Sequence, residues 1–264
     1  FYSLRTEFES ILETSTVQAR AYERDPSLSW QQQAMHLPSV EGLQYPSPLP
    51  ERVLKEIEEI LSVYPGNFER GLARAGIYQP YIKQRFTASG LPEDLVWLAM
   101  VESQYTPRIV SRAGAGGMWQ FMRSTGRRYG LEIDEYVDER YDWKKSTDAA
   151  IAYLKDLNAM FEGEWPLAVS AYNMGEGGLE RAIAANGGDR NLWELIEKPP
   201  AANRIRLETK KFYPRLLASA IVGKNPDRYG FNPEVLPSDD TVSIPITGAY
   251  LLKDIEKAAG VPSG

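Results

Sequence analysis

Hydrophobic side chains recur at helical spacing along most of the chain. Residues 3–24 form the first such stretch, with one apolar face made by Leu4, Phe8, Ile11 and Leu12. Residues 37–50 contain four prolines, which predicts an extended strap after this helix. Helical spacing then returns at Val53, Leu54, Ile57, Ile60 and Leu61. It continues over residues 68–75 and over residues 78–88. Strand signals are almost absent here, so the pattern predicts a mainly α protein.

Two later helices have recognisable start signals. The motif Pro92-Glu93-Asp94 places a proline at an early helical position and two carboxylates in the first turn, where the helix dipole favours them. The motif Ser146-Thr147-Asp148 is predicted to cap a central core helix, whose apolar stripe is Ala150, Ile151, Leu154, Leu157 and Phe161. Further helices are expected from Trp165 to Gly175 and over about residues 206–222.

The composition changes after Pro226. Residues 240–247 are the only convincing strand, and residues 251–259 return to a helical pattern, so a second small unit is expected to begin near Ser238. The predicted organisation has three parts: an N-terminal helix and proline-rich strap (residues 1–50), a main helical domain (residues 51–236, core about 90–180) and the start of a C-terminal linker or module (residues 237–264).

Composition and charge narrow the function classes. Of the 264 residues, 43% are hydrophobic and 25% are charged, as in soluble globular domains, and the formal net charge of -6 disfavours a nucleic acid partner. The longest apolar runs, such as Leu95 to Val101, are far shorter than the ~18 residues that would cross a bilayer. The chain opens Phe1-Tyr2-Ser3-Leu4-Arg5, so no signal peptide is expected within it. The absence of cysteine and the single histidine, His36, argue against a thiolate or multi-histidine metal site and a Ser-His-Asp triad. We therefore expect neither a metal nor a cofactor.

Glu102 is the best candidate for a catalytic acid. Helical spacing places it on the apolar stripe above Leu98 and Ala99. A carboxyl group held there loses hydration, which raises its pKa toward the range of a general acid at neutral pH. The alternative from position alone is a glutamate at a helix end whose carboxylate reaches water.

Two glycine-rich segments follow. Residues 113–121 bring three glycines ahead of Trp119 and Gln120, so the backbone can approach a ligand closely and the Gln120 amide can bind a sugar hydroxyl or N-acetyl group. The alternative is a flexible turn with a buried tryptophan. Residues 170–178 end a helix with a phenol and an amide, Asn173, beside glycines. Here the alternative is a glycine C-cap in which Asn173 satisfies backbone groups.

Taken together, these segments resemble a known family. Glu102-Ser103, Gly117-Met118-Trp119-Gln120 and Ala171-Tyr172-Asn173 are similar, in order and spacing, to the signature of the family 1 lytic transglycosylases, which are lysozyme-like enzymes that cut peptidoglycan. Further motifs resemble the membrane-bound lytic transglycosylase D subgroup: Gly90 to Leu95, Ser124-Thr125-Gly126, Val137 to Arg140, Ser146 to Ala150, Asn173 to Gly177, and Glu208-Thr209 followed by Tyr213. Residues 242–259 look like the start of the region that precedes LysM modules there.

The resemblance covers about residues 50–230 and implies a lysozyme-like (goose-type, SLT) helical catalytic domain over residues 51–236, with an N-terminal helical extension. It also implies a reaction. Glu102 would protonate the oxygen of the β-1,4 bond between N-acetylmuramic acid and N-acetylglucosamine. It would then accept the proton of the muramic 6-hydroxyl, which closes on C1 to give a 1,6-anhydro sugar. The substrate's own N-acetyl group would replace the second carboxylate of ordinary glycosidases.

The same resemblance implies roles for further residues. Ser103 would orient Glu102, Gln120 and Asn173 would hold acetamido or peptide groups, Tyr172 and Tyr213 would line the cleft and hydrogen-bond the acid, and Gly117 and Met118 would complete the substrate-binding set.

Two positions depart from the family pattern. Met118 stands where the family usually has leucine, which conserves volume, and Arg123 stands where it usually has proline, which places a cation near the glycine-rich segment. Glu176 and Asp138 are other acids that could assist, but their motifs are those of loop and capping positions.

The expected partner is the peptidoglycan glycan strand. We expect a monomer in the periplasm of a Gram-negative bacterium, associated with the outer membrane or secreted, with any membrane anchor in a segment outside this chain. Two other functions stay open. One is a lysozyme-type hydrolase on the same fold, which would leave a reducing sugar end, and the other is a non-catalytic glycan-binding protein that kept the groove.

Overall fold

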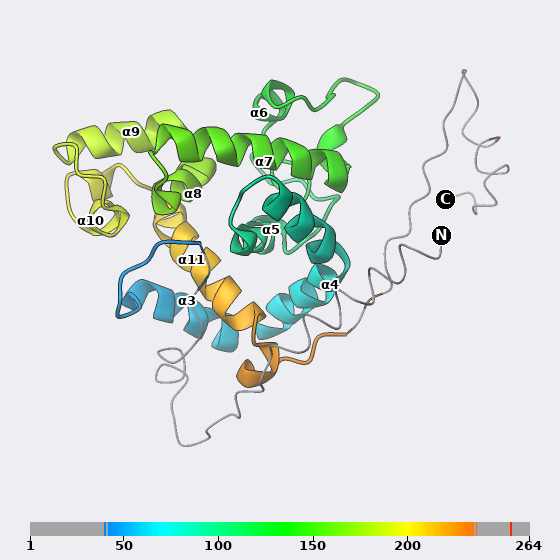
Figure 1. Ribbon diagram of the computed structural model, residues 1–264, viewed down its shortest axis with the longest axis horizontal. Helices are drawn as coiled ribbons and strands as arrows, with labels where there is room; N and C mark the ends of the chain where they lie inside the picture. Colours follow the sequence, from blue (N-terminus) through cyan, green and yellow to red (C-terminus); the bar gives the residue numbers. More distant parts are fainter. Residues whose placement is uncertain (1–39, 41, 235, 237–253, 255–264) are drawn as a thin grey trace.

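The computed structural model describes residues 40, 42–234, 236 and 254 (Figure 1). Over these residues it is built from α-helices and short 3-10 helices, and the only β structure there is a set of isolated bridges. The mainly α prediction is confirmed. The predicted helix over residues 3–24, the strand over 240–247 and the helix over 251–259 lie outside the described residues.

The first described helices are α3 (Glu51–Ser62) and α4 (Pro65–Ala88). The sequence predicted two helices where α4 is one, with Pro80 inside it. Proline removes one backbone hydrogen bond from a helix. The helix nevertheless continues, because both of its halves bury apolar side chains, such as Leu72 before Pro80 and Phe86 after it.

A buried helix lies near the centre of the molecule. The 3-10 helix η1 (Glu93–Trp97) leads directly into α5 (Leu98–Ser103). Pro92 precedes the first residue of η1 and so stands one position earlier than predicted, whereas both acids lie in the first turn as expected. Figure 1 shows α5 between α4, α7 and α11, an arrangement in which Leu98 and Ala99 are completely buried.

The next elements are α6 (Arg123–Arg128), η2 (Glu139–Tyr141) and the long core helix α7 (Trp143–Met160). The predicted cap of α7 at Ser146 to Asp148 is wrong, because the helix begins earlier. The Asp142 side chain accepts hydrogen bonds from the backbone N–H groups of Lys144 and Lys145, both at 3.0 Å. The extra turn is stabilised by Trp143, whose ring packs edge-on against two tyrosines of α4, Tyr78 and Tyr81.

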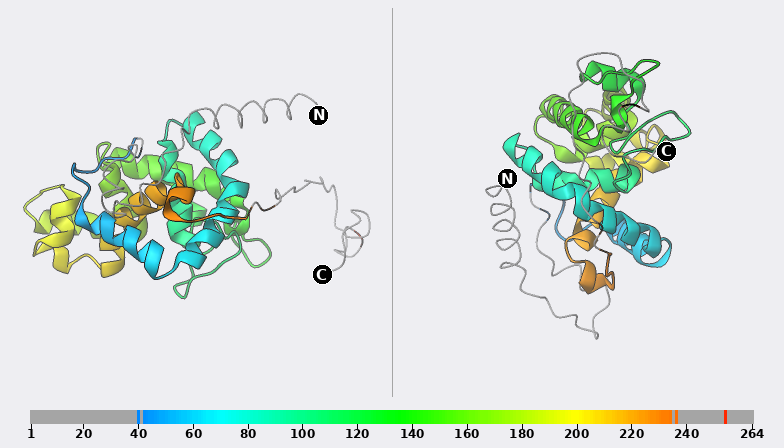
Figure 2. Two further views of the ribbon diagram at one scale, coloured as in Figure 1. Left: turned by 90° about the horizontal axis from the view of Figure 1, so that it is seen from below. Right: turned by 90° about the vertical axis from the view of Figure 1, so that its right-hand side faces the viewer.

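The C-terminal half completes the core. It comprises α8 (Trp165–Met174), α9 (Glu176–Ala185), α10 (Leu192–Glu197), η3 (Ala201–Asn203), α11 (Leu207–Gly223) and η4 (Pro226–Tyr229). α8 ends at Gly175 as predicted, at a backbone φ of 84° that glycine adopts without strain. α11 packs against α3, α5 and α8, and its path across the molecule can be followed in Figures 1 and 2.

An ion-pair network joins α11 to α3. Glu56 is only 2% exposed, and its carboxylate accepts from Arg215 Nε at 2.8 Å and lies 3.4 Å from Lys211 Nζ. At its C-terminal end α11 meets η1, where a Cβ on Gly223 would lie 2.1 Å from the Trp97 ring. Glycine is therefore required for this close approach of helix to ring.

Candidate active site

Glu102 occupies the last turn of the buried helix α5. The helix stops abruptly after it, because Gln104 and Tyr105 both adopt left-handed conformations, with φ of 52° and 55°. Their backbone N–H groups bond back to Met100 O and Ala99 O. The Tyr105 hydroxyl is buried and donates to Val96 O at 2.8 Å. A left-handed conformation costs free energy for a residue other than glycine, and here two consecutive residues adopt it. The hydrogen bonds around them hold this conformation, so the helix end that carries Glu102 is rigid.

The carboxyl group of Glu102 opens into a cavity of about 780 Å³. Its side chain is half-buried. Loss of hydration, followed by the negative charge of Glu208, raises its pKa to about 8. The predicted direction of this pKa shift is confirmed. The alternative, a glutamate at a helix end whose carboxylate is fully hydrated, does not fit this loss of hydration. The sequence analysis did not identify Glu208 as a second cause.

Several further side chains line the same cavity. Those that bear on the chemistry are Gln120, Phe121, Tyr153, Tyr172, Asn173, Glu176, Arg181, Arg204, Arg206, Glu208 and Thr209. The rings of Tyr153 and Tyr172 lie 5.0 Å apart and form an aromatic wall. Aromatic faces beside amide and hydroxyl groups are suited to a polar ligand with apolar C–H faces, such as a sugar.

Part of the glycine-rich segment, residues 113–121, packs against the protein core and not against the cavity. Gly117 has a φ of 82°, and a Cβ on it would lie 1.8 Å from Arg140 O. Its backbone therefore packs on Arg140 and does not line the cavity. Met118 and Trp119 are completely buried, and Trp119 Nε1 donates to Thr147 Oγ1 at 3.0 Å. Neither Gly117 nor Met118 is among the residues that line this cavity.

Gln120 lines the cavity, together with Ala113, Ala115 and Phe121 of this segment. It adopts a φ of 50°, and its Nε2 donates to Gly117 O at 2.7 Å. Each of the two interpretations from sequence therefore describes a part of the segment. Trp119 is buried in the core, as in the alternative of a turn, and Gln120 faces the cavity, as a ligand-binding amide would.

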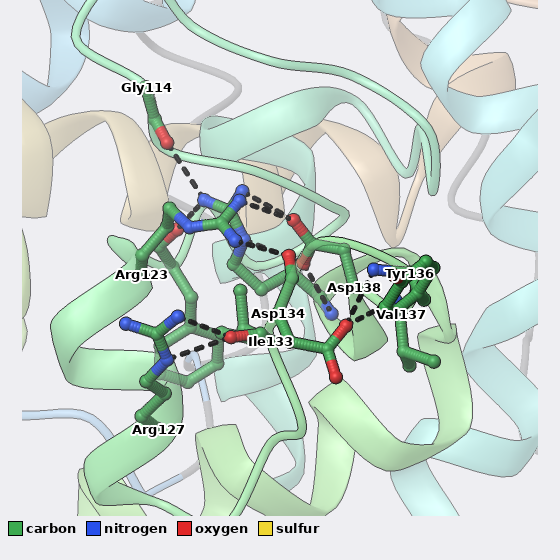
Figure 3. Close-up of polar contacts among 10 residues, drawn as sticks. Gly114, Arg123, Arg127, Ile133, Asp134, Tyr136, Val137 and Asp138 are labelled. Atoms are coloured by element: carbon green, nitrogen blue, oxygen red, sulfur yellow. Dashed lines mark hydrogen bonds and ion pairs between the residues drawn. The ribbon is translucent and has the colours of Figure 1, made fainter.

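Arg140 holds the glycine-rich segment in place within the group of polar contacts around Asp138 that Figure 3 draws. Its guanidinium group, only 3% exposed, donates to both oxygens of Asp138, at 2.8 and 2.7 Å. It also donates to Gly114 O at 2.8 Å and Phe121 O at 2.9 Å, so it ties both ends of the segment to one point. This interaction holds the pKa of Asp138 below its ordinary value. Asp138 is therefore an ionised structural residue and is not suited to be a second acid.

Arg123 belongs to the same cluster. Its guanidinium group lies 3.3 Å from Asp138 Oδ2 and donates to Asp134 O at 2.8 Å, as Figure 3 shows. The expected cation near the glycine-rich segment is therefore engaged by the loop that contains Asp134 and Asp138, and it does not line the cavity.

The predicted pair Tyr172 and Asn173 does line the cavity. The Tyr172 hydroxyl donates to Trp119 O at 2.8 Å and not to Glu102. Even so, the charge of Glu102 contributes to raising the pKa of this phenol, after the larger effect of burial, so the two groups are close. Asn173 Oδ1 accepts from Thr209 Oγ1 at 2.6 Å. This bond turns the oxygen to the protein and leaves the amide N–H groups as donors for a ligand.

Two predicted site residues have other partners. Ser103 Oγ donates to Met118 O at 2.7 Å and accepts from Thr106 N at 3.1 Å, so it joins α5 to the glycine-rich segment and makes no bond to Glu102. Tyr213 is completely buried, and its hydroxyl donates to Gln44 O at 2.8 Å. Tyr213 does not line this cavity, which reaches only the first turn of α11, whereas Tyr213 lies one turn further along the helix.

Sequence reasoning missed the side chains that close the cavity from the C-terminal side. Glu208 was noticed only as part of a motif, and Arg181, Arg204 and Arg206 were not singled out. Arginines in such positions are typical of solvated helix ends and give no local signal. Glu176 does line the cavity, and its carboxylate lies 3.2 Å from Arg128 Nη1.

The residues that the structure describes contain neither a cluster of metal ligands nor a membrane-spanning helix. They contain no group of three or more histidine, cysteine, aspartate or glutamate side chains arranged to hold a metal ion. None of the helices placed there is both long enough and apolar enough to cross a membrane.

Comparisons with known proteins bear on this site. Residues 80–193 match the family model described as the Transglycosylase SLT domain. The chain is 37% identical over 188 residues to membrane-bound lytic murein transglycosylase D of Escherichia coli strain K12, a match that covers 70% of this chain and 39% of that protein. It is 34% identical over 148 residues to a peptidoglycan transglycosylase of Escherichia phage T7, covering 50% and 11% of the two chains.

Among solved structures, the lytic transglycosylase Slt of Pseudomonas aeruginosa aligns with a TM-score of 0.38 and 20% identity, over 58% of this chain and 24% of that one. The chain thus spans about two fifths of the length of the Escherichia coli relative.

Proposed function

We propose that the chain is a peptidoglycan lytic transglycosylase of the transglycosylase SLT family, because residues 80–193 match that family model and 70% of the chain aligns at 37% identity with a lytic murein transglycosylase. The proposed reaction breaks the β-1,4 bond between N-acetylmuramic acid and N-acetylglucosamine without water and leaves a 1,6-anhydromuramic end. The observation that carries the proposal is a single carboxyl group, Glu102, which is held at a rigid helix end in a large cavity with a pKa of about 8.

Such a carboxyl group can serve as acid and base in turn. With a pKa of about 8, Glu102 is mostly protonated at neutral pH and can donate a proton to the leaving glycosidic oxygen. The resulting carboxylate lies in a poorly hydrated site and is a strong base. It can therefore accept the proton of the muramic 6-hydroxyl as that oxygen attacks C1. The proton balance closes within the sugar and Glu102, so no water and no metal enter the scheme.

The proposed ligand contacts follow from the lining side chains. Gln120 and Asn173 present amide groups to the cavity and would bind acetamido groups of the glycan. Tyr172 and Tyr153 would support a sugar ring with their aromatic faces. Tyr172 would also exclude water from Glu102, which sustains the raised pKa of the acid.

A lysozyme-type hydrolase is the second candidate, and one observation favours it. Glu208 lies near enough for its charge to raise the pKa of Glu102, and its side chain is exposed. A carboxylate in that position could activate a water molecule, as two-carboxylate glycosidases require. Under the lytic mechanism Glu208→Gln keeps turnover, whereas under the hydrolytic mechanism it abolishes turnover.

The decisive experiment is digestion of purified sacculi with analysis of the products by mass spectrometry. We expect 1,6-anhydro ends, which are lighter than reducing ends by one water. Glu102→Gln should lower the rate by roughly 10²- to 10⁴-fold, and the exposed Glu58→Gln should match the wild type. Reducing ends would identify a hydrolase. Binding to sacculi without cleavage would identify a glycan-binding protein and refute the proposal.

The substrate also implies a location. A peptidoglycan-cleaving enzyme acts in the bacterial cell envelope, and we propose that this protein is a monomer in the periplasm of a Gram-negative bacterium, with any membrane anchor in a segment outside this chain. Fractionation of cells that produce the full-length protein, with light scattering of the purified chain, tests both statements. A cytosolic protein or a stable dimer would contradict them.

A further inference from the structure

Three arginine side chains line the cavity without an acidic partner. Arg181 belongs to α9, Arg204 follows η3, and Arg206 immediately precedes the first residue of α11. All three are exposed to solvent. In the part of the chain that the structure describes, none of their guanidinium groups forms an ion pair or a side-chain hydrogen bond. Most other arginines of the domain are engaged, as Arg140 and Arg123 are, so this group differs from its surroundings.

The arginines make the cavity locally positive in a chain whose formal net charge is -6. The acids that line the cavity are Glu102, Glu176 and Glu208. Glu102 is mostly uncharged at neutral pH because its pKa is raised to about 8, and Glu176 is paired with Arg128, which lies outside the cavity lining. Three cations therefore face one unpaired carboxylate, and the open guanidinium groups favour an anionic group on the ligand.

The three arginines are exposed to solvent, whereas Glu102 is half-buried at the end of α5. The charge that acts on the pKa of Glu102 comes from Glu208, and the arginines are not among its causes. Positive charges close to Glu102 would lower that pKa and weaken its role as a proton donor. The exposed arginines are therefore suited to a part of the ligand that lies nearer to solvent than the bond being broken. Residues of the first turn of α11 also line the cavity beside Arg206.

Resting on the proposed function, we propose that Arg181, Arg204 and Arg206 form a carboxylate subsite, which selects glycan strands whose peptide substituents carry free carboxylates. The N-acetylated sugar backbone itself carries no charge, so the peptide that is amide-linked to the muramic lactyl group supplies the anionic groups of such a strand. A guanidinium group binds a carboxylate through two parallel hydrogen bonds and through opposite charge. A carboxamide is uncharged, so a guanidinium group distinguishes the two.

Binding measurements test the subsite without turnover. The full chain with Glu102→Gln is titrated calorimetrically with a peptide-bearing tetrasaccharide, and with the same compound after every carboxylate has been converted to a carboxamide. We expect tighter binding of the carboxylate form and a loss of that preference at high salt. Adding Arg204→Gln and Arg206→Gln should weaken binding of the carboxylate form roughly tenfold and leave the carboxamide form within about twofold.

Arg108→Gln is the matched control, because Arg108 is an exposed arginine outside the cavity lining, and it should change neither affinity. Arg181→Gln alone should reproduce part of the effect, and circular dichroism confirms that each variant is folded. Equal binding of the two ligands by the parent chain, equal weakening of both by the arginine variants, or binding of neither ligand would overturn the subsite. Absence of cleavage by the wild type, with the preference for carboxylate intact, would instead refute the proposed function alone.

Discussion

Replacing the carboxyl group of Glu102 by an amide should stabilise the folded protein, and the gain should grow with pH. The pKa of this group is about 8 in the folded chain and 4.5 as an ordinary glutamate. Between these values the folded state retains a proton that the unfolded chain releases, so the stability of the wild type falls as the pH rises. Glutamine does not titrate, and Glu102→Gln is free of this loss.

The size of the gain follows from the two pKa values. Each pH unit above the unfolded pKa costs the wild type ~1.4 kcal/mol until the folded group ionises as well. The upper limit is therefore ~3 kcal/mol at pH 7 and ~5 kcal/mol above pH 8. Because Glu102 is half-buried and water screens part of its charge, we expect ~1 to 3 kcal/mol at pH 7 and no gain below about pH 4.

Urea unfolding at about pH 4, 7 and 9 measures this difference directly, with the midpoint and slope compared between variant and wild type. Glu58→Gln serves as control, because Glu58 is exposed and its replacement should shift stability equally at all three pH values. A gain for Glu102→Gln that does not change with pH would show that the folded state accommodates the Glu102 carboxylate without penalty. The case for Glu102 as the proton donor would then fail.

Three further predictions concern the site and its support. Glu208→Gln removes the charge that helps to raise the pKa of Glu102, so the descending alkaline limb of the pH-rate profile should move to lower pH but stay above 4.5, since desolvation is the larger cause; an unmoved limb would contradict this. Arg140→Gln should destabilise the domain by ~3 kcal/mol in urea unfolding and let the pKa of Asp138 rise, because it removes the buried guanidinium group that donates to Asp138, Gly114 O and Phe121 O; a neutral effect would mean that water replaces the guanidinium group. Cleavage of sacculi should continue with EDTA present, and loss of activity that one specific ion restores would contradict the proposed proton transfers.

Local sequence determined most helices and the place of Glu102 on one of them. The apolar period along the chain is a property of neighbouring residues, and it correctly indicated a mainly α domain and a glutamate on the buried side of a helix. Helix boundaries were less well determined. Asp142 caps α7 in place of the predicted Ser146, and Pro80 lies inside α4, because packing of Trp143 and of both halves of α4 outweighs local signals.

Tertiary structure alone decided which side chains share the cavity. Glu208 and Arg206 reach it because α11 packs against α5 and α8 and brings its N-terminus to the acid, whereas Tyr213 on the same helix is turned into the core. Gly117, judged from sequence to face a ligand, packs on Arg140. Residue spacing fixes what one helix face presents, but charges and backbone from distant segments act on Glu102 only through the packing of helices, which no local pattern encodes.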